Sequence, residues 1–407
     1  MWRIIALFII ITGLAVAKVT YENYKLFSLV PASQAQLSIL HLLKHDGSFN
    51  YWQEPSFINQ EVDIMVPPHK LTEFTEILSI FKFSYTVKIE NIQELVDKTI
   101  PQHPSKSFNF KDYHRFNKIN LHMIHLAREH DNVEYIPICC TYKNYIIGGV
   151  HIKNGEEKPT VFIEGGMHGR EWISPATVMY ILQALLTSND MLVRRVAESH
   201  NWYIFPVLNP DGYEYTFTDD RLWSKTLQPS SAICNGSDLN RNWGYLWNNS
   251  NTIKNPCAEN YPGSKPFSER EIESISIFMS KRRIDTYVSF QSYGQKLMIP
   301  YAYTLEHTVP NYDWLMRIAT EAANVLKWQH GTHYQVGTVS NLTGIADGTS
   351  IDYVTRILNK PIAFVYKLRD TSRYGYLLPP EEIVPTGEET LKSLMTLLYY
   401  ITEKILN

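Results

Sequence analysis

A histidine and a glutamate three residues apart are the first candidates for chemistry in this sequence. His168 and Glu171 lie within residues 165–172, GGMHGREW, directly after the apolar run 160–164. Such a run predicts a buried strand, and the paired glycines allow a sharp turn after it. One turn of backbone can aim both side chains at a single point, and an imidazole with a carboxylate are two ligands of a catalytic zinc site. A chain with 14 histidines also contains such a pair by chance, so the rest of the sequence must decide.

A large α/β domain is needed to position these residues. From residue 108 to residue 407, strand patterns alternate with helical patterns, which predicts one domain of that class. Sites in open α/β sheets form beyond the carboxyl ends of the strands. Four predicted strands end near residues 165, 209, 291 and 367. We therefore expect His168, the turn 209–212, Gln291 and Lys367 to share one cleft.

The last helix of this domain is predicted to begin at Thr386. Thr386 and Glu389 have the spacing of a capping box. The helix should then bury one apolar stripe, made of Leu391, Leu394, Leu398, Ile401 and Ile405.

The region before residue 92 has the pattern of a smaller domain. Residues 24–30, 49–52, 62–66 and 85–89 are strand-like, and helical patterns follow Pro31 and Pro68. The order β-α-β-β-α-β is typical of a ferredoxin-like α+β arrangement. We assign residues 18–91 to this domain, residues 92–107 to a short helix with a connecting segment, and residues 108–407 to the large domain.

The N-terminus and the composition indicate a secreted globular protein. Residues 1–17 combine Arg3, an apolar run and an A-x-A motif, which predicts a signal peptide; an uncleaved anchor is the alternative. The net charge of −3 gives no reason to expect nucleic acid or an anionic membrane as a partner. We expect an extracellular monomer.

Secretion makes a disulfide and glycosylation relevant. Cys234 and Cys257 are the expected disulfide pair, because together they close a modest loop. Cys139 and Cys140 are adjacent, and two free thiols are favoured there over a strained vicinal bond. Three sequons mark candidate glycosylation sites, at Asn235, Asn248 and Asn341.

Five motifs together resemble the secreted zinc procarboxypeptidases of the pancreatic A/B type. They are residues 62–68 (VDIMVPP), 166–173 (GMHGREWI), 209–213 (NPDGY), 238–243 (DLNRNW) and 368–375 (LRDTSRYG). The resemblance covers nearly everything after the signal peptide. It implies a mixed-sheet metallocarboxypeptidase fold, with a central twisted sheet flanked by helices, preceded by a ferredoxin-like prodomain. Residues 18–91 would be that prodomain, packed against an exopeptidase that trims C-terminal residues.

The metal positions implied by this resemblance are kept only in part. The family holds zinc with two histidines and one glutamate. His168 and Glu171 match two of these ligands, and Asp238 matches the carboxylate that orients the first histidine. The third position holds Gln291, a neutral amide that suits zinc poorly. Zinc is therefore the cofactor of the family, and we predict that this chain binds it weakly or not at all.

Three further positions of the family mechanism are changed. The general-base glutamate is replaced by Lys367, a cation that would also repel a divalent metal. The carbonyl-polarising arginine is replaced by Ser224, and the tyrosine that closes over the substrate by Gly344. A lost electrostatic stabiliser of this kind typically costs ~3 kcal/mol. These changes predict a protein without peptidase activity; the alternative is an active zinc enzyme that releases apolar or aromatic C-terminal residues.

The positions that bind a substrate are better kept. Arg170, Asn240 and Arg241 match the residues that hold the terminal carboxylate, and Tyr293 is grouped with them. Ile351 lies at the base of the specificity pocket and implies an apolar or aromatic C-terminal residue. We therefore expect the C-termini of peptides or proteins as ligands, with a structural or storage role as the alternative.

Lys367 has one more expected role. Without zinc, Glu171 would be an isolated carboxylate in a cleft, which is costly. We predict that the Lys367 ammonium points toward Glu171 as its ion-pair partner.

Overall fold

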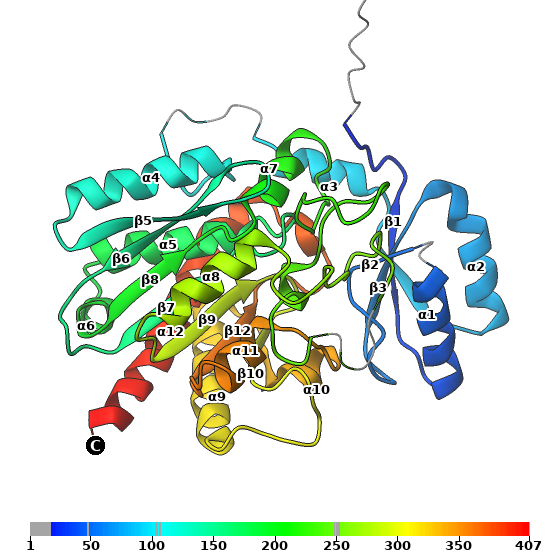
Figure 1. The fold of residues 1–407 in the computed structure, drawn as a ribbon. Helices are drawn as coiled ribbons and strands as arrows, with labels where there is room; N and C mark the ends of the chain where they lie inside the picture. The colour runs from blue at the N-terminus through cyan, green and yellow to red at the C-terminus, as the bar shows by residue number, and fades with distance from the viewer. Residues whose placement is uncertain are drawn as a thin grey trace, which may run out of the picture.

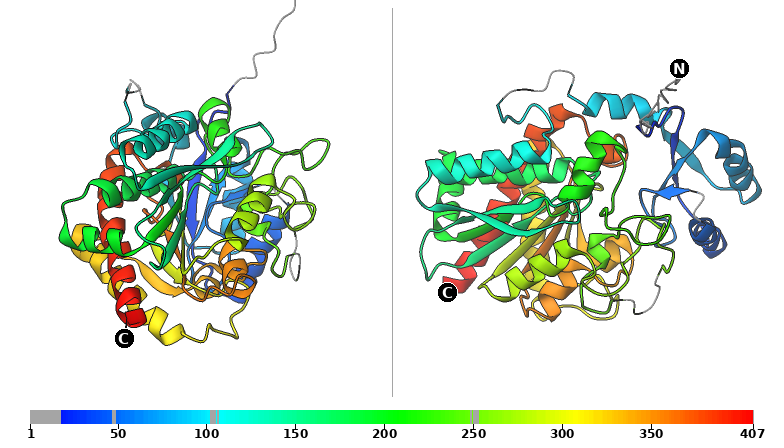
Figure 2. Two further views of the ribbon diagram at one scale, coloured as in Figure 1. Left: turned by 60° about the vertical axis from the view of Figure 1, so that its left-hand side comes forward. Right: turned by 45° about the horizontal axis from the view of Figure 1, so that its top comes forward.

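A small domain packs beside a larger α/β domain in the computed structural model of this chain (Figure 1). The structure describes residues 18–46, 49–101, 105, 107–247, 249 and 253–406. The predicted signal peptide, part of the connecting segment and the sequon at Asn248 lie outside these residues. Figure 2 gives two further views of the arrangement.

The small domain has the predicted ferredoxin-like order. It also includes the helix at 92–99, which was assigned to the connecting segment, because Ile92 and Val96 pack with Leu26 and Ile89 in one buried cluster. Its elements are β1 (Lys25–Leu29), α1 (Gln34–Asp46), β2 (Asn50–Tyr51), β3 (Val62–Val66), a 3₁₀ turn (Pro68–Lys70), α2 (Leu71–Ile80), β4 (Tyr85–Ile89) and α3 (Ile92–Thr99). The strands form an antiparallel sheet in the order β2-β3-β1-β4. Helices α1 and α2 cover the face of this sheet that points away from the large domain (Figure 1). Phe81 caps the C-terminal end of α2 and is 40% exposed.

The first half of the large domain builds one side of its sheet. Its elements are α4 (Phe116–Glu129), β5 (Val133–Cys140), β6 (Ile146–Ile152), β7 (Thr160–Glu164), α5 (Ile173–Thr187), α6 (Met191–Ser199), β8 (Asn201–Phe205), α7 (Pro210–Thr218) and a 3₁₀ turn (Leu239–Arg241).

The second half completes the sheet. Its elements are α8 (Arg270–Ser280), β9 (Thr286–Gln291), β10 (Lys296–Ile299), α9 (Tyr312–His330), β11 (Gln335–Thr338), α10 (Val339–Thr343), α11 (Ser350–Arg356), β12 (Ala363–Lys367), 3₁₀ turns (Gly375–Leu377 and Pro380–Glu382) and α12 (Ile383–Leu406). The strand order is β11-β10-β12-β9-β7-β8-β6-β5, with parallel and antiparallel pairs. This mixed sheet is the predicted fold class.

The centre of the sheet is parallel and covered on both faces. Strands β12, β9, β7 and β8 run parallel, and buried parallel strands require nearly continuous apolar runs. One face packs against α4, α5, α9 and α12, and the other against α8 and α11. The carboxyl ends of β7, β9 and β12 therefore meet at one edge, on the side where the small domain lies.

The start of α12 differs from the prediction. The helix begins at Ile383, after a 3₁₀ turn that starts at Pro380, so Thr386 lies inside it. Thr386 Oγ1 donates to the carbonyl of Glu382 at 2.6 Å, and Glu389 binds Arg369 rather than the backbone. The predicted capping box is therefore wrong. The apolar stripe is buried as expected at Leu391, Leu394, Leu398 and Ile401.

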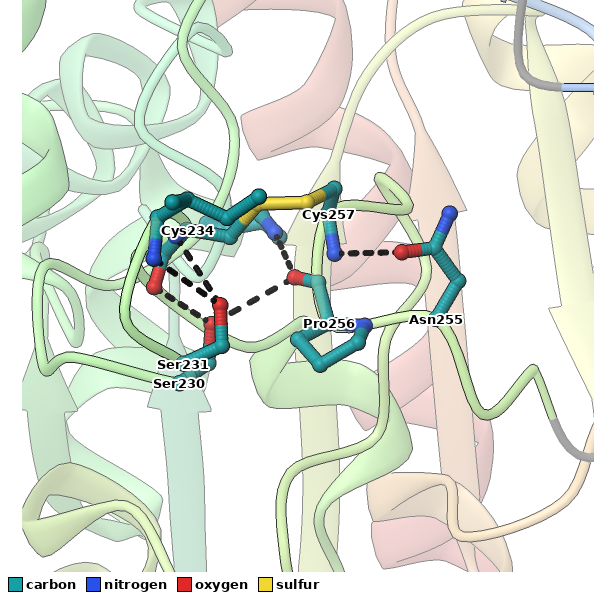
Figure 3. The surroundings of a disulfide bond; sticks show 8 residues. Ser230, Ser231, Cys234, Asn255, Pro256 and Cys257 are labelled. Atoms are coloured by element: carbon teal, nitrogen blue, oxygen red, sulfur yellow. Dashed lines mark hydrogen bonds between the residues drawn. A yellow bond between two sulfur atoms is a disulfide. The ribbon is translucent and has the colours of Figure 1, made fainter.

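The structure joins Cys234 to Cys257, as the sequence predicts (Figure 3). Beside this disulfide, the backbone N–H of Cys257 donates to Asn255 Oδ1, and Ser230 Oγ donates to the carbonyl of Cys234. Cys139 and Cys140 are free and exposed. The sequon residues Asn235 and Asn341 are exposed as well. No helix within the described part of the chain is long and apolar enough to cross a membrane.

Candidate functional site

The carboxyl ends of β7, β9 and β12 open into a cavity of about 170 Å³ between the two domains. We call it the interdomain cavity. His168, Gln291 and Lys367 line it, as predicted from the strand ends. The turn 209–212 does not. The Asn209 amide is buried and donates to the carbonyls of Met167, Ser224 and Lys225. Through these hydrogen bonds, the turn supports the loop that carries His168.

His168 lies between two carboxylates. Its Nδ1 is 3.0 Å from Glu171 Oε1, and its Nε2 is 2.9 Å from Asp238 Oδ1. Burial lowers the pKa of His168, but the charges of Glu171 and Asp238 outweigh it and raise the pKa to about 10. The side chain is therefore an imidazolium shared by two acids. Glu171 Oε2 also accepts the backbone N–H of Ser292 at 2.9 Å.

Close backbone packing fixes this loop. Gly166 has φ +60°, which favours glycine. A Cβ at Gly169 would lie 2.6 Å from the carbonyl oxygen of Gly212. Asp238 caps the 3₁₀ turn Leu239–Arg241, because its Oδ1 accepts the backbone N–H of Asn240 at 2.9 Å, and the same oxygen contacts His168 Nε2.

The donor set in the cavity does not fit a zinc ion. A catalytic zinc site needs three nitrogen, thiolate or carboxylate ligands around one point. His168 and Glu171 supply two donors of these types, 3.0 Å apart, but the third position is the Gln291 amide, whose Nε2 donates to Ser289 Oγ at 3.2 Å. Lys367 is the register partner of Gln291 on the adjacent strand. Within the described residues, no group of three or more His, Cys, Asp or Glu side chains is placed to hold one metal ion.

Lys367 does not form the predicted ion pair with Glu171. No carboxylate oxygen within the described residues lies within 4.0 Å of Lys367 Nζ, and His168 is the charged partner of Glu171. The prediction failed because His168, three residues away on the same loop, is the nearer cation. Burial lowers the pKa of Lys367, and Arg241 and Arg170 lower it further, against Glu171 and Glu54.

Ser224 and Gly344 lie outside the set of residues that line this cavity. Ser224 is buried, and its carbonyl accepts the backbone N–H of Gly169 at 2.9 Å. Gly344 has φ +85°, and a Cβ there would lie 2.6 Å from Ser56 Oγ of the small domain. Neither residue offers a side chain that could replace the group expected at its position.

The predicted carboxylate-binding residues do line the interdomain cavity. The Asn240 amide oxygen accepts bonds from the backbone N–H and the hydroxyl of Ser350, both at 3.2 Å. Arg241 Nε is 3.8 Å from Asp238 Oδ2. Ile351 belongs to an apolar end of the cavity, which also contains Met298, Ala346 and Val365.

Arg170 is held at the boundary between the domains. Its guanidinium lies 4.0 Å from the ring centroid of Tyr376. Its Nη1 is 3.5 Å from Asn50 Oδ1 of the small domain and 3.9 Å from Glu259 Oε2. Its buried Nε has no acceptor among the described residues.

The small domain contributes site residues that sequence reasoning missed. Asp63 on β3 is fully buried and accepts bonds from Tyr293 Oη at 2.6 Å, Ser372 Oγ at 2.5 Å and Gln53 Nε2 at 2.9 Å. Tyr293, grouped with the substrate-binding residues, is therefore engaged by the small domain. The sequence signal was an acid at the second position of the otherwise apolar run 62–66. Lys296 was also missed, although it directly precedes the apolar run 297–299.

Two family models match the chain. Residues 119–393 match the model described as zinc carboxypeptidase, and residues 27–99 match the carboxypeptidase activation peptide.

Individual proteins give the same result. The chain is 41% identical over 388 residues to zinc carboxypeptidase A 1 of Anopheles gambiae, covering 93% of this chain and 89% of that protein. It is 36% identical over 303 residues to carboxypeptidase B of Astacus astacus, covering 72% of this chain and 99% of that protein. The crystal structure of thrombin activatable fibrinolysis inhibitor superposes with a TM-score of 0.85 at 27% identity, covering 94% of this chain and 100% of that one.

Proposed function

Because the chain belongs to the zinc carboxypeptidase family and carries the activation peptide of that family, we propose that it is a secreted, non-catalytic member whose cleft binds the C-termini of peptides or proteins. The disulfide between Cys234 and Cys257 and the signal peptide predicted for residues 1–17 support secretion. We further propose that it acts as a monomer.

One observation carries the loss of catalysis. Gln291 and Lys367, at the third metal position and the base position, are register partners at the ends of neighbouring strands. An amide and an ammonium group therefore face the cavity where the family reaction needs an imidazole and a carboxylate. Losing a general base alone commonly costs about 10²–10⁴-fold in rate.

A separate set of contacts supports the binding role. Asn240 and Arg241 line the cavity beside an apolar end that contains Ile351. A guanidinium next to an amide suits a terminal carboxylate, and the apolar end suits an apolar or aromatic C-terminal side chain. Arg241 is paired only loosely, at 3.8 Å from Asp238, so a ligand carboxylate can gain a closer contact.

The small domain closes this cleft in the intact chain. Tyr51, Trp52 and Glu54 line the cavity together with the large domain. Burial raises the pKa of Glu54, but Lys44 and Arg241 outweigh it and lower the pKa, so the Glu54 carboxylate is held charged near Arg241. We therefore infer that a peptide enters only when the small domain is displaced or removed.

The test compares the intact chain with protein from which the small domain has been removed. Peptides that end in Phe are titrated by calorimetry with a free carboxylate and with an amidated C-terminus. We expect binding of the free acid to the opened form, loss of that binding on amidation, and at least about tenfold weaker binding for Arg241→Met. Arg128→Met, at an exposed position on α4, is the matched control. Equal affinity for acid and amide would refute the carboxylate-binding role.

The same samples test the catalytic alternative. Zinc content is measured by elemental analysis, and hydrolysis of the free-acid peptides is followed by mass spectrometry. We expect zinc well below one per chain and no release of the C-terminal residue. One zinc per chain with turnover would establish an active carboxypeptidase instead.

A further inference from the structure

Two lysines face each other across neighbouring strands in the interdomain cavity. Lys296 on β10 and Lys367 on β12 are direct register partners of an antiparallel pair. Directly opposed residues of such a pair point to the same face of the sheet, and like charges placed there are destabilising. Both lysines line the cavity. Burial and the charge of Lys367 lower the pKa of Lys296 to about 8.

The acids near this pair are already engaged. Glu171 binds His168 and the backbone of Ser292, and Asp63 binds Tyr293, Ser372 and Gln53. Glu54 pairs with Lys44 at 2.9 Å, and Glu61 pairs with Lys88 at 3.0 Å. Among the described residues, no ion pair within 4.0 Å joins either Lys296 or Lys367 to a carboxylate.

The two ammonium groups also keep unused hydrogen-bond donors. Each ammonium group carries three donors. Lys296 Nζ uses one of them for the carbonyl of Leu342, at 3.0 Å. Lys367 has no hydrogen-bond acceptor among the described residues. The cavity of about 170 Å³ far exceeds the roughly 10–15 Å³ that one water molecule needs, so a polyatomic ion has room there.

We propose that Lys296 and Lys367 form a binding site for a small oxyanion, a phosphate-type or carboxylate group, in the cavity that the small domain closes. An anion between the two lysines replaces a repulsion with two charge-assisted hydrogen bonds. The flexible lysine stems allow both ammonium groups to converge on it. This site shares the interdomain cavity with Asn240 and Arg241 but uses other side chains. It needs the small domain in place, whereas the proposed binding of C-termini needs the domain displaced.

The test uses the full chain and thermal unfolding. Sodium sulfate, phosphate and succinate are titrated against sodium chloride at constant ionic strength. A ligand that binds only the folded state raises Tm in a saturable way. We expect such a rise with at least one oxyanion beyond the effect of chloride. Phosphate and sulfate acting without succinate would identify a phosphate-type ligand, and succinate acting without them would identify a carboxylate ligand; either outcome supports the site.

Variants locate the effect. Lys296→Met and Lys367→Met should each weaken the apparent affinity by at least about tenfold, while Lys367→Arg, which keeps the charge, should retain binding. Lys392→Met, at an exposed position on α12, is the matched control. The proposal is overturned if all three oxyanions behave like chloride, or if the stabilisation persists unchanged in both methionine variants. Neither result bears on peptide binding, which the Arg241 variant tests separately.

Discussion

At the scale of single residues, burial and neighbouring charges together decide which groups in this protein are charged. His168 is charged despite burial because two acids hold it, whereas Glu271 has no such partner. Glu271 is buried in the first turn of α8, and its Oε1 has no hydrogen-bond partner among the described residues. Burial raises the pKa of Glu271 to about 8, and the charges of Asp211 and Glu269 add to the shift.

This shift predicts a pH-dependent stability that Glu271→Gln removes. The folded protein holds the Glu271 proton up to about pH 8, while the unfolded chain releases it near its ordinary pKa of 4.5. The free energy of unfolding therefore falls as pH rises between these values, by up to about 1.4 kcal/mol per pH unit, and this loss is complete above pH 8. Urea unfolding from pH 4 to pH 9 measures this. The free energy of unfolding of the variant, relative to that of the wild type, should rise as the pH rises through that interval.

A neighbouring position supplies the control for this experiment. Glu273 lies on the same helix but is exposed, so Glu273→Gln should leave the pH profile of the wild type unchanged. Parallel profiles for Glu271→Gln and the wild type would show that Glu271 ionises normally in the folded protein.

At the scale of elements, local pattern located the strands better than it located the helix ends. The strands at 62–66, 85–89 and 160–164 were predicted from strand-like patterns, and the structure has strands over those residues. The start of α12 was misplaced because Thr386 and Glu389 have capping-box spacing, yet a distant arginine determines what Glu389 does. Arg369, 20 residues earlier in the chain, donates to both oxygens of Glu389, at 2.9 Å and 2.5 Å. Rules based on the spacing of neighbouring residues cannot predict that contact.

This contact predicts that Glu389→Ala is strongly destabilising. Glu389 is fully buried, and it also accepts a bond from Thr332 Oγ1 at 2.6 Å. Removing it leaves Arg369 with only Glu382, and breaking a buried pair in this way typically costs about 3–5 kcal/mol. Chemical denaturation measures the loss. Glu388→Ala, next in the chain, breaks only a partly exposed contact with His330 and should cost less than about 1 kcal/mol. Similar losses for the two variants would contradict the role assigned to the Arg369 pair.

At the scale of the whole molecule, the sequence predicted the cleft and a prodomain packed against the large domain, but not the contacts that close the cleft. The predicted strand ends placed His168, Gln291 and Lys367 in one cleft, and in the structure all three line one cavity. Those strand ends did not reveal that Trp52 and Glu54 line the same cavity, or that Asp63 binds Tyr293 and Ser372. An interface between two domains leaves no periodic pattern in either sequence segment. The adjacency of Lys296 and Lys367 was hidden for the same reason, since it depends on strand register between β10 and β12.

The contact between the two domains combines an apolar cluster with buried polar groups. Trp52 and Met65 of the small domain share one buried cluster with Leu222, Tyr293 and Tyr376 of the large domain. Beside this cluster, Asp63 accepts hydrogen bonds from the hydroxyl groups of Tyr293 and Ser372. Both bonds go to Asp63 Oδ2, whereas Oδ1 has no hydrogen-bond partner among the described residues. The two bonds tie the surfaces together, since separating the domains leaves the hydroxyl donors unpaired.

We therefore predict that the small domain stays bound after the connecting segment is cut, and that Asp63→Ala loosens it. A protease site placed between residues 101 and 107 allows the cut, and size-exclusion chromatography with time measures separation. The variant leaves the Tyr293 and Ser372 hydroxyls without their acceptor, each at a cost of about 1–3 kcal/mol. The small domain should therefore dissociate from the large domain at least about tenfold faster in the variant. Asp97→Ala, at an exposed position on α3, should dissociate like the wild type. If Asp63→Ala also behaves like the wild type, the apolar cluster alone holds the domains together, and the acid on β3 has no part in closing the cleft.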